Sequence, residues 1–415
     1  MKNQKKVMIL GAGEGQLPFI NICRKKGYYV IVVSIPGQYP GFKIADKSYY
    51  IDTRDKDAIL QVAEKEKIDA ILTDQTDVSV PTVAYVSEKL CLRGIGYDTS
   101  LLFTNKYEMR KIAKSAGVHV PEFRLAKNVE EARAFALEIG FPLMIKPVDS
   151  SGSRGVTKIS SIEELNEHFY LSQNYSTDET VLLEQFIKGK EYLVDGFAMD
   201  NKYINLDLGV KEYFNVPNIF VSRMCMFSSV ARVNDEVGKK VLEANMKLVN
   251  YIGLEFGITH AEYLYNEDDG NVYLVEIAAR GGGVFLSSDI TPSATGVNTN
   301  EMLIDYVVEG NKSDISKIKI DDKVSSWLCF SLPKGRILEI NGVEDVKIID
   351  GVHKVVLDDI YIGKEVENLT DDSNKYGPFL INADTEEESY EIINKIKERF
   401  DVRVQTEHGI KNLIW

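Results

Sequence analysis

The N-terminal part of the chain alternates short apolar runs with amphipathic stretches, and this alternation constrains the fold more than any other feature. Residues 7–10 form an apolar run that ends at a glycine turn, and a helical pattern leads from there to a second run at 29–33. Another helical pattern over 55–67 precedes the apolar run 68–73. Strands and helices that alternate at this spacing form a parallel sheet with right-handed crossovers. Residues 1–100 are therefore predicted to form one α/β domain.

The rest of the sequence predicts two further units, so that the fold class is multidomain, α/β followed by α+β. Residues 101–315 begin with a predicted helix over 104–117, with Thr104 as its N-cap. They end with a predicted hairpin over 257–280 that turns at 266–271. The remaining residues, 316–415, mix short apolar runs with one late helical pattern and are predicted to form a small α+β unit.

Charge and composition exclude several classes of protein. The chain has 415 residues and a net charge of −14, which disfavours a protein that coats nucleic acid or binds anionic membrane. No apolar stretch approaches the ~20 residues of a membrane span, so we expect a cytoplasmic protein with neither a nucleic-acid nor a membrane partner. The four cysteines lie far apart, which predicts isolated buried thiols in place of disulfides or a zinc site.

The glycine turn at the start has two interpretations. Gly11, Gly13 and Gly15 sit where a strand meets a helix, as in phosphate-binding turns. The third glycine of the dinucleotide fingerprint is replaced by Gln16, and no acidic residue follows at the ribose-binding place. A tight structural turn, with Gly13 contacting a substrate carboxylate, is favoured over dinucleotide binding.

The middle of the chain carries an ordered set of charged residues. Lys106 and Lys146 come first, followed by a glycine- and serine-rich loop over 149–156, a run from Glu184 to Glu191, then Glu262 and Glu276-x-x-x-Arg280. This order resembles the ATP-grasp superfamily of ligases over nearly the whole chain. The C-terminal part resembles that of carboxylate–amine ligases that join amino acids. The resemblance implies a Rossmann-like pre-ATP-grasp domain over 1–100, a two-lobed ATP-grasp domain over 101–315 with a lid at about 118–187, and a C-terminal domain over 316–415.

The resemblance also implies how ATP is held. Lysine ammoniums would contact the phosphates, the loop amides would form an anion nest over them, and Arg154 would add charge at the γ-phosphate. Backbone groups of the hinge would read the adenine edge, and Glu191 would accept the ribose hydroxyls. A buried strand with a surface glutamate is the alternative for the hinge. The predicted ATP-binding residues are Lys106, Lys146, Ser151, Gly152, Ser153, Gly155, Val156, Glu184, Gln185, Phe186, Ile187, Glu191 and Lys211.

Two glutamates are predicted to hold a metal. Glu262 and Glu276 lie fourteen residues apart across the predicted hairpin, which can bring their carboxylates together. Facing carboxylates without a basic neighbour repel unless a cation lies between them, and Mg²⁺, with Mn²⁺ as an alternative, suits oxygen ligands. The family usually has Asn at the position of Ala278, which changes the predicted metal shell. His260 is interpreted as a packed strand residue.

Arg280 and the three glycines after it are predicted to hold the substrate. By the resemblance, the arginine binds the acyl acceptor or the transferring phosphate, while a salt bridge to Glu276 alone is the alternative. The predicted catalytic residues are Arg280, Lys146 and Arg154, and the predicted substrate contacts are Arg280, Gly281, Gly282, Gly283 and Gly13.

The leading hypothesis is a ligase that uses Mg-ATP to phosphorylate a small-molecule carboxylate, so that an amine or a thiol can attack the acyl phosphate. A rival hypothesis is an enzyme of the same fold that forms carboxyphosphate or carbamoyl phosphate, since EIAAR resembles a motif of aminoimidazole ribonucleotide carboxylases. Two hypotheses from different classes of protein are a nicotinamide-dependent oxidoreductase and a non-catalytic ATP sensor. Family analogy suggests a homodimer.

Overall fold

The structure, a computed structural model, describes residues 4–150, 152, 154–216 and 220–415. Its N-terminal unit has a four-stranded sheet in the order β3-β2-β1-β4, with every pairing parallel. The parallel sheet predicted from the alternation is thus confirmed. The strands are β1 (Lys6–Leu10), β2 (Tyr29–Ser34), β3 (Lys47–Tyr50) and β4 (Ala70–Thr73). The helical segments are η1 (Glu14–Gln16), α1 (Leu17–Lys25), α2 (Pro40–Ile44), α3 (Lys56–Glu66), η2 (Asp77–Ser79), α4 (Val80–Lys89) and α5 (Tyr97–Leu102).

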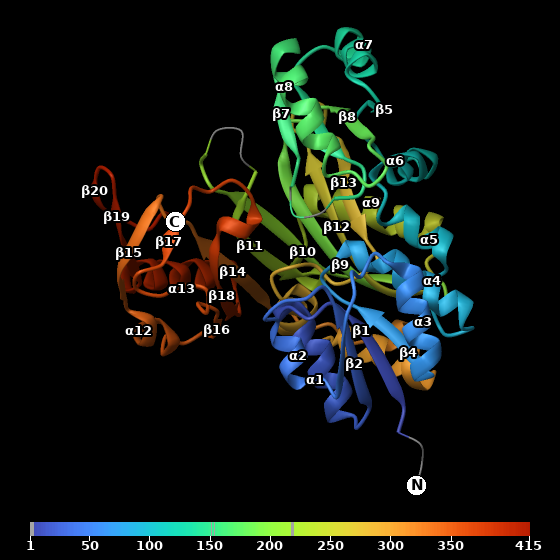
Figure 1. The fold of residues 1–415 in the computed structure, drawn as a ribbon. Coiled ribbons are helices and arrows are strands. Elements are labelled where there is room, and N and C mark those ends of the chain that lie inside the picture. The colour runs from blue at the N-terminus through green and yellow to red at the C-terminus, as the bar shows by residue number, and fades with distance from the viewer. Residues whose placement is uncertain (1–3, 151, 153, 217–219) are drawn as a thin grey trace.

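A second unit stands apart at the top of Figure 1, where helices cover a small antiparallel sheet. Its strand order is β5-β8-β6-β7, and its buried core draws only on its own residues, among them Phe135 and Phe169. Asn128 and Ser161 cap its two helices through their side chains. The elements are β5 (Phe123–Ala126), α7 (Val129–Ile139), β6 (Leu143–Pro147), β7 (Thr157–Ile159), α8 (Ile162–Gln173) and β8 (Val181–Gln185). α6 (Lys106–Ser115) precedes it.

The central element is an eight-stranded sheet in the order β13-β12-β9-β10-β11-β14-β18-β16. Its first five strands come from the middle of the chain, and α9 (Glu236–Ile252) packs against it. Those strands are β9 (Lys190–Met199), β10 (Lys202–Tyr213), β11 (Ser222–Ser229), β12 (Phe256–Tyr265) and β13 (Val272–Ala278). The helical segments nearby are η3 (Val230–Arg232), η4 (Leu286–Ile290), α10 (Thr291–Thr295), α11 (Thr299–Ile304) and η5 (Asp305–Glu309).

The C-terminal part contributes to two sheets. β14 (Val324–Phe330), β16 (Val352–Val355) and β18 (Tyr376–Ala383) continue the central sheet across the predicted boundary at 315. A separate four-stranded sheet has the order β17-β15-β19-β20. Its strands are β15 (Gly335–Asn341), β17 (Glu365–Val366), β19 (Asp401–Thr406) and β20 (Gly409–Asn412), and the helical segments are η6 (Ile315–Lys317), α12 (Val343–Lys347), η7 (Asp372–Asn374) and α13 (Glu386–Arg399).

Two local predictions need correction. The N-cap of α6 is Asn105, whose side chain accepts hydrogen bonds from two amides of the first turn. The Thr104 hydroxyl instead donates to a carbonyl of the preceding helix, so it is not available to cap. All four cysteines are free, as predicted, but Cys91 is exposed and only Cys23, Cys225 and Cys329 are buried.

Among the described residues, no helix is both long enough and apolar enough to cross a bilayer.

Candidate functional site

A cavity of about 830 Å³ lies where the four parts of the molecule meet. The central sheet forms its floor, the β5–β8 unit contributes one wall, and the N-terminal and C-terminal parts contribute the others. Most of the predicted site residues line it. These are Lys106, Lys146, Gly152, Val156, Glu184, Gln185, Phe186, Ile187, Glu191, Lys211, Glu262, Glu276, Arg280 and Gly283.

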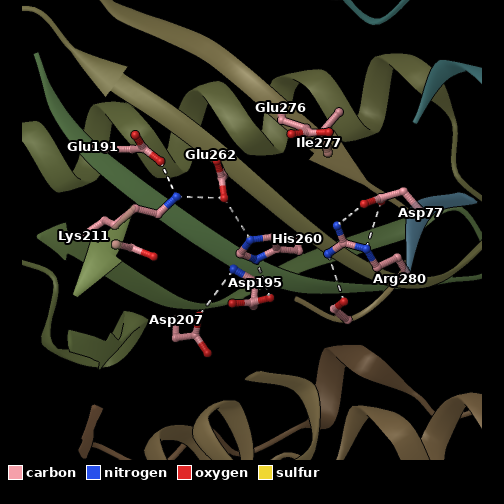
Figure 2. A network of polar contacts seen from close by, with 12 residues as sticks. Asp77, Glu191, Asp195, Asp207, Lys211, His260, Glu262, Glu276, Ile277 and Arg280 are labelled. Atoms are coloured by element: carbon pink, nitrogen blue, oxygen red, sulfur yellow. Dashed lines mark hydrogen bonds and ion pairs between the residues drawn. The ribbon is translucent and has the colours of Figure 1, made fainter. Parts of the chain in front are cut away.

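The two predicted metal ligands face each other on adjacent strands. Glu262 of β12 and Glu276 of β13 are direct cross-strand partners, and both side chains point into the cavity (Figure 2). They do have basic neighbours, contrary to the premise of the sequence argument. Lys211 Nζ lies 2.9 Å from Glu262 Oε1, and Lys106 Nζ lies 3.0 Å from Glu276 Oε1. In this structure the repulsion between the carboxylates is therefore offset by ammonium groups.

Lys211 joins Glu262 to Glu191. Its ammonium contacts both carboxylates (Figure 2). The Tyr213 hydroxyl also contacts Glu191. Burial would raise the pKa of Glu262, but Lys211 and His260 outweigh it and hold that pKa well below its usual value. Burial raises the pKa of Glu191, and the negative charge of Glu262 raises it further. The attraction of Lys211, which is shared with Glu262, does not outweigh these two effects. Of the two carboxylates, Glu262 is thus the one held firmly in its charged form.

His260 is a packed strand residue, yet it is not an isolated one. Its Nδ1 lies 3.1 Å from Asp195 Oδ1, and its Nε2 lies 3.6 Å from Glu262 Oε1. Burial would lower the pKa of His260, but Asp195 and Glu262 outweigh it and raise that pKa to about 9. Asp195 in turn accepts no bond at Oδ2 from any described residue, and its amide donates to Asp207. Two buried carboxylates, those of Asp195 and Asp207, thus lie next to His260.

Glu184 is a buried ion-pair centre. Arg110 Nε lies 2.6 Å from Glu184 Oε1, and Lys146 Nζ lies 2.5 Å from Oε2. Burial would raise the pKa of Glu184, but the two cations outweigh it and hold that pKa at about 2. Burial lowers the pKa of Lys146, against the attraction of Glu184. The alternative of a strand with a surface glutamate does not hold, because Glu184 and Glu191 are both buried.

Arg280 is paired with the N-terminal domain. Its guanidinium donates to both oxygens of Asp77, over 2.9 and 2.6 Å, and not to Glu276, so the alternative of a Glu276 salt bridge does not hold (Figure 2). Both side chains line the cavity. Burial would lower the pKa of Arg280, but Asp77 outweighs it and raises that pKa. These two hydrogen bonds hold one edge of the planar guanidinium in place.

The glycines after Arg280 serve close packing. A Cβ on Gly281 would lie 2.3 Å from Ser287 Oγ, and one on Gly282 would lie 2.4 Å from a methyl of Leu286. The Gly281 amide donates to buried Asp74. Burial raises the pKa of Asp74 to about 6, against its hydrogen bond from Ser287. Gly283, by contrast, lines the cavity and has open space around it.

Some predicted contacts are placed elsewhere. Arg154, Gly155, Gly281 and Gly282 are not among the described residues that line the cavity. Nor is Gly13, whose amide donates to the Gln16 side chain and closes the N-terminal turn. Ser151 and Ser153 lie outside the described residues.

Sequence reasoning missed Arg110, Asp77 and Asp74. Arg110 carried a usable signal, because it follows Lys106 by four residues and helical residues at that spacing share a face. Asp77 and Asp74 carried none, since their partners lie more than 200 positions away in the chain.

The donor set fits Mg-ATP. No group of three or more His, Cys, Asp or Glu side chains suited to a metal exists among the described residues. Two carboxylates alone leave most of an octahedron unfilled, and phosphate oxygens are the ligands that complete it in ATP-dependent enzymes. Lys106, Lys146, Lys211 and Arg280 line the same cavity as the two carboxylates, so cations of the kind that bind phosphate oxygens are present there.

Comparison with known proteins places this geometry in a family. Residues 139–289 match the model of the ATP-grasp domain. The chain thus contains an ATP-grasp domain. The resemblance seen in the sequence and the predicted ligase class are thus confirmed.

ATP-grasp proteins similar to this chain act on different substrates. It is 26% identical to a formate-dependent phosphoribosylglycinamide formyltransferase of Ignicoccus hospitalis, over 67% of this chain and 70% of that one. It is 28% identical to an alanine–anticapsin ligase of Bacillus subtilis, over 62% of this chain and 58% of that one. The crystal structure of an L-amino acid ligase from Bacillus licheniformis superposes with a TM-score of 0.80, at 21% identity over 98% of this chain and all of that one.

Proposed function

We propose that the protein is an ATP-dependent carboxylate–amine ligase. The observation that carries this proposal is the facing pair Glu262 and Glu276, with Lys106, Lys211 and Arg280 in the same cavity. A site with two metal-binding carboxylates and several cations suits phosphoryl transfer, in which charge neutralisation and positioning supply most of the catalysis.

In the proposed reaction, an oxygen of the substrate carboxylate attacks the γ-phosphorus of ATP. The bond to the β,γ-bridging oxygen breaks, and ADP leaves. An amine nitrogen then attacks the acyl carbon, phosphate leaves with the electron pair of the broken C–O bond, and the nitrogen loses a proton to solvent or phosphate. When bound, Mg²⁺ neutralises the negative charge on the phosphates.

Each charged side chain has a proposed role in these steps. Glu262 and Glu276 would hold Mg²⁺, while Lys106, Lys146 and Lys211 would bind phosphate oxygens. Arg280, fixed by Asp77, would bind the carboxylate and the phosphoryl group in transfer. The β5–β8 unit, which has its own core, would close over the nucleotide and exclude water from the acyl phosphate.

A second candidate forms a mixed anhydride from a small acid. The EIAAR motif and the similarity to a formate-dependent enzyme support it. Formate or bicarbonate would then replace the amino-acid carboxylate at Arg280.

The deciding experiment measures ADP and phosphate release from Mg-ATP with pools of amino acids, with bicarbonate and with formate. Mass spectrometry of the products follows. ADP release that requires amino acids and yields a condensed product supports the ligase. Release with formate or bicarbonate alone supports the second candidate. ATP binding without release under any condition contradicts both.

A further inference from the structure

The cavity extends well beyond the part that ATP would occupy. The predicted metal pair lies on β12 and β13, at one edge of the central sheet, and the predicted adenine hinge lies between β8 and β9. Trp327 of β14 lines the same cavity, four strands away from β12. Neighbouring strands are ~4.8 Å apart, so this end lies about 19 Å across the sheet from Glu262.

The cross-strand register shows that this far end faces the cavity. Lys211 pairs with Cys225, and Cys225 pairs with Trp327. Directly paired residues on neighbouring strands point to the same face of a sheet. The floor therefore changes along one row from a charged lysine to an indole ring.

The surface between Arg280 and Trp327 is apolar. Leu193, Leu286 and Trp327 line it, each no more than 3% exposed, and they belong to one buried cluster. Val284 lies beside them and also lines the cavity.

A neutralised ion pair closes the strip. Lys375 lies over the Trp327 ring at 4.9 Å, and its ammonium bonds to Asp372 over 2.6 Å and to Ser222 over 3.0 Å. All three partners line the cavity. Because Asp372 already balances the lysine charge, this end of the cavity offers little attraction to a charged substrate group.

We infer that this apolar strip, formed by Leu193, Val284, Leu286 and Trp327, receives a large apolar side chain of an amino-acid substrate. The inference rests on the proposed ligase function and narrows its substrate class. With the reacting carboxylate at Arg280, the side chain lies on the strip toward Trp327. Leucine, isoleucine, methionine and phenylalanine have the required chemistry, whereas serine and aspartate do not.

The protein offers a direct probe of this site. It has two tryptophans, and Trp415 packs in the separate C-terminal core. In a Trp415→Phe variant, all tryptophan emission comes from Trp327. We expect L-leucine and L-phenylalanine, added with a non-hydrolysable Mg-ATP analogue, to change this emission saturably. Half-saturation with L-alanine, L-serine or L-aspartate should need at least about tenfold more ligand, because lost methylenes cost that much in an apolar pocket.

A kinetic arm separates a failed inference from a failed function. Trp327→Ala should raise the KM for leucine at least about tenfold and leave the KM for ATP unchanged. Trp327→Phe, which keeps an aromatic ring, should restore most of the loss and guards against misfolding of the alanine variant. The emission titration involves no turnover, so it reports on the strip even if ligation fails.

Two outcomes would overturn the inference. One is a saturable emission change with polar amino acids and none with apolar ones. The other is leucine-dependent ADP release with neither an emission change nor a KM effect in both Trp327 variants. If neither turnover nor emission responds to any amino acid, the proposed function fails together with the inference.

Discussion

Single residues in this cavity are held by shared charges more than by isolated pairs. Glu184 forms ion pairs with both Arg110 and Lys146, and Lys211 forms ion pairs with both Glu191 and Glu262. Buried charges are costly when unpaired. Removing one member of a pair therefore destabilises the fold, because it leaves the partner as a buried charge without a counter-charge. The residues of these two clusters are therefore needed for local stability as well as for the proposed binding of ATP.

Glu184 should make stability depend on pH in the acid range. Glu184→Gln leaves two buried cations without a counter-charge and should lower the free energy of unfolding at pH 7 by about 3–5 kcal/mol. Urea unfolding of both proteins measures this difference.

The pH profile follows from the direction of the shift. The pKa of Glu184 is about 2 when folded and 4.5 ordinarily, so its contribution is complete above pH 4.5 and is lost toward pH 2. The difference in the free energy of unfolding between the parent and Glu184→Gln should therefore narrow between pH 4.5 and pH 2. Glu138→Gln, which removes a surface pair with Arg124, is the control and should stay within about 1 kcal/mol of the parent. A gap independent of pH would contradict the ion-pair account.

Glu276 is expected to matter for turnover and little for folding. Its carboxylate is partly exposed, and the Lys106 ammonium also donates to the Ser150 carbonyl, so loss of Glu276 leaves that cation with a hydrogen-bond partner and costs little stability. Glu276→Ala should lower ADP release at least about 100-fold, because metal charge stabilises the transferring phosphoryl group by several kcal/mol. The melting temperature should change little. Glu267→Ala, in the exposed turn of the same hairpin, is the matched control; equal turnover in both variants would rule out the metal role of Glu276.

At the scale of elements, the loop after β13 links three parts of the molecule. Gly281 and Gly282 let it pass between Asp74 and His260, and Val284 and Phe285 then adopt left-handed backbone conformations, with φ near +57° and +60°. A β-branched residue rarely adopts that conformation, and such strain persists only where the surroundings impose it. The loop is thus held in shape by packing on both sides.

Two glycines of this loop should respond differently to alanine. Gly281→Ala places a methyl against Ser287 and Asp74 and should cost about 2 kcal/mol or more. Gly283→Ala meets nothing within 4 Å and should leave the melting temperature unchanged. Thermal unfolding of both variants measures this contrast, and equal losses would show that the loop is not packed as described.

At the scale of the whole molecule, the cores cross the boundaries drawn from the sequence. One buried cluster combines residues of β1 and β2 with residues of β9, β12 and α11. The central sheet passes from β11 to β14 across position 315. The β5–β8 unit is different, because its core is its own.

A fragment ending at residue 315 should therefore fail to fold as a soluble monomer. Without β14, β11 becomes a sheet edge, and the buried side chains of Met224 and Phe227 lose their cover. Exposed apolar edges promote aggregation. Size-exclusion chromatography and circular dichroism of the fragment, beside the full chain with the same tag, test this; a monomeric, cooperatively unfolding fragment would support an independent domain ending at 315.

The sequence by itself determined what is local. Apolar spacing placed β1, β2 and β4 of the N-terminal sheet, and the hairpin turn set Glu262 opposite Glu276. The tertiary structure alone decided the pairing of Arg110 with Glu184, of Arg280 with Asp77, and the continuation of the sheet past 315. Those partners lie 74 and 203 positions apart. Charge pairing has no period along the chain, so no local pattern marks its partner, whereas secondary structure repeats every 2 or 3.6 residues.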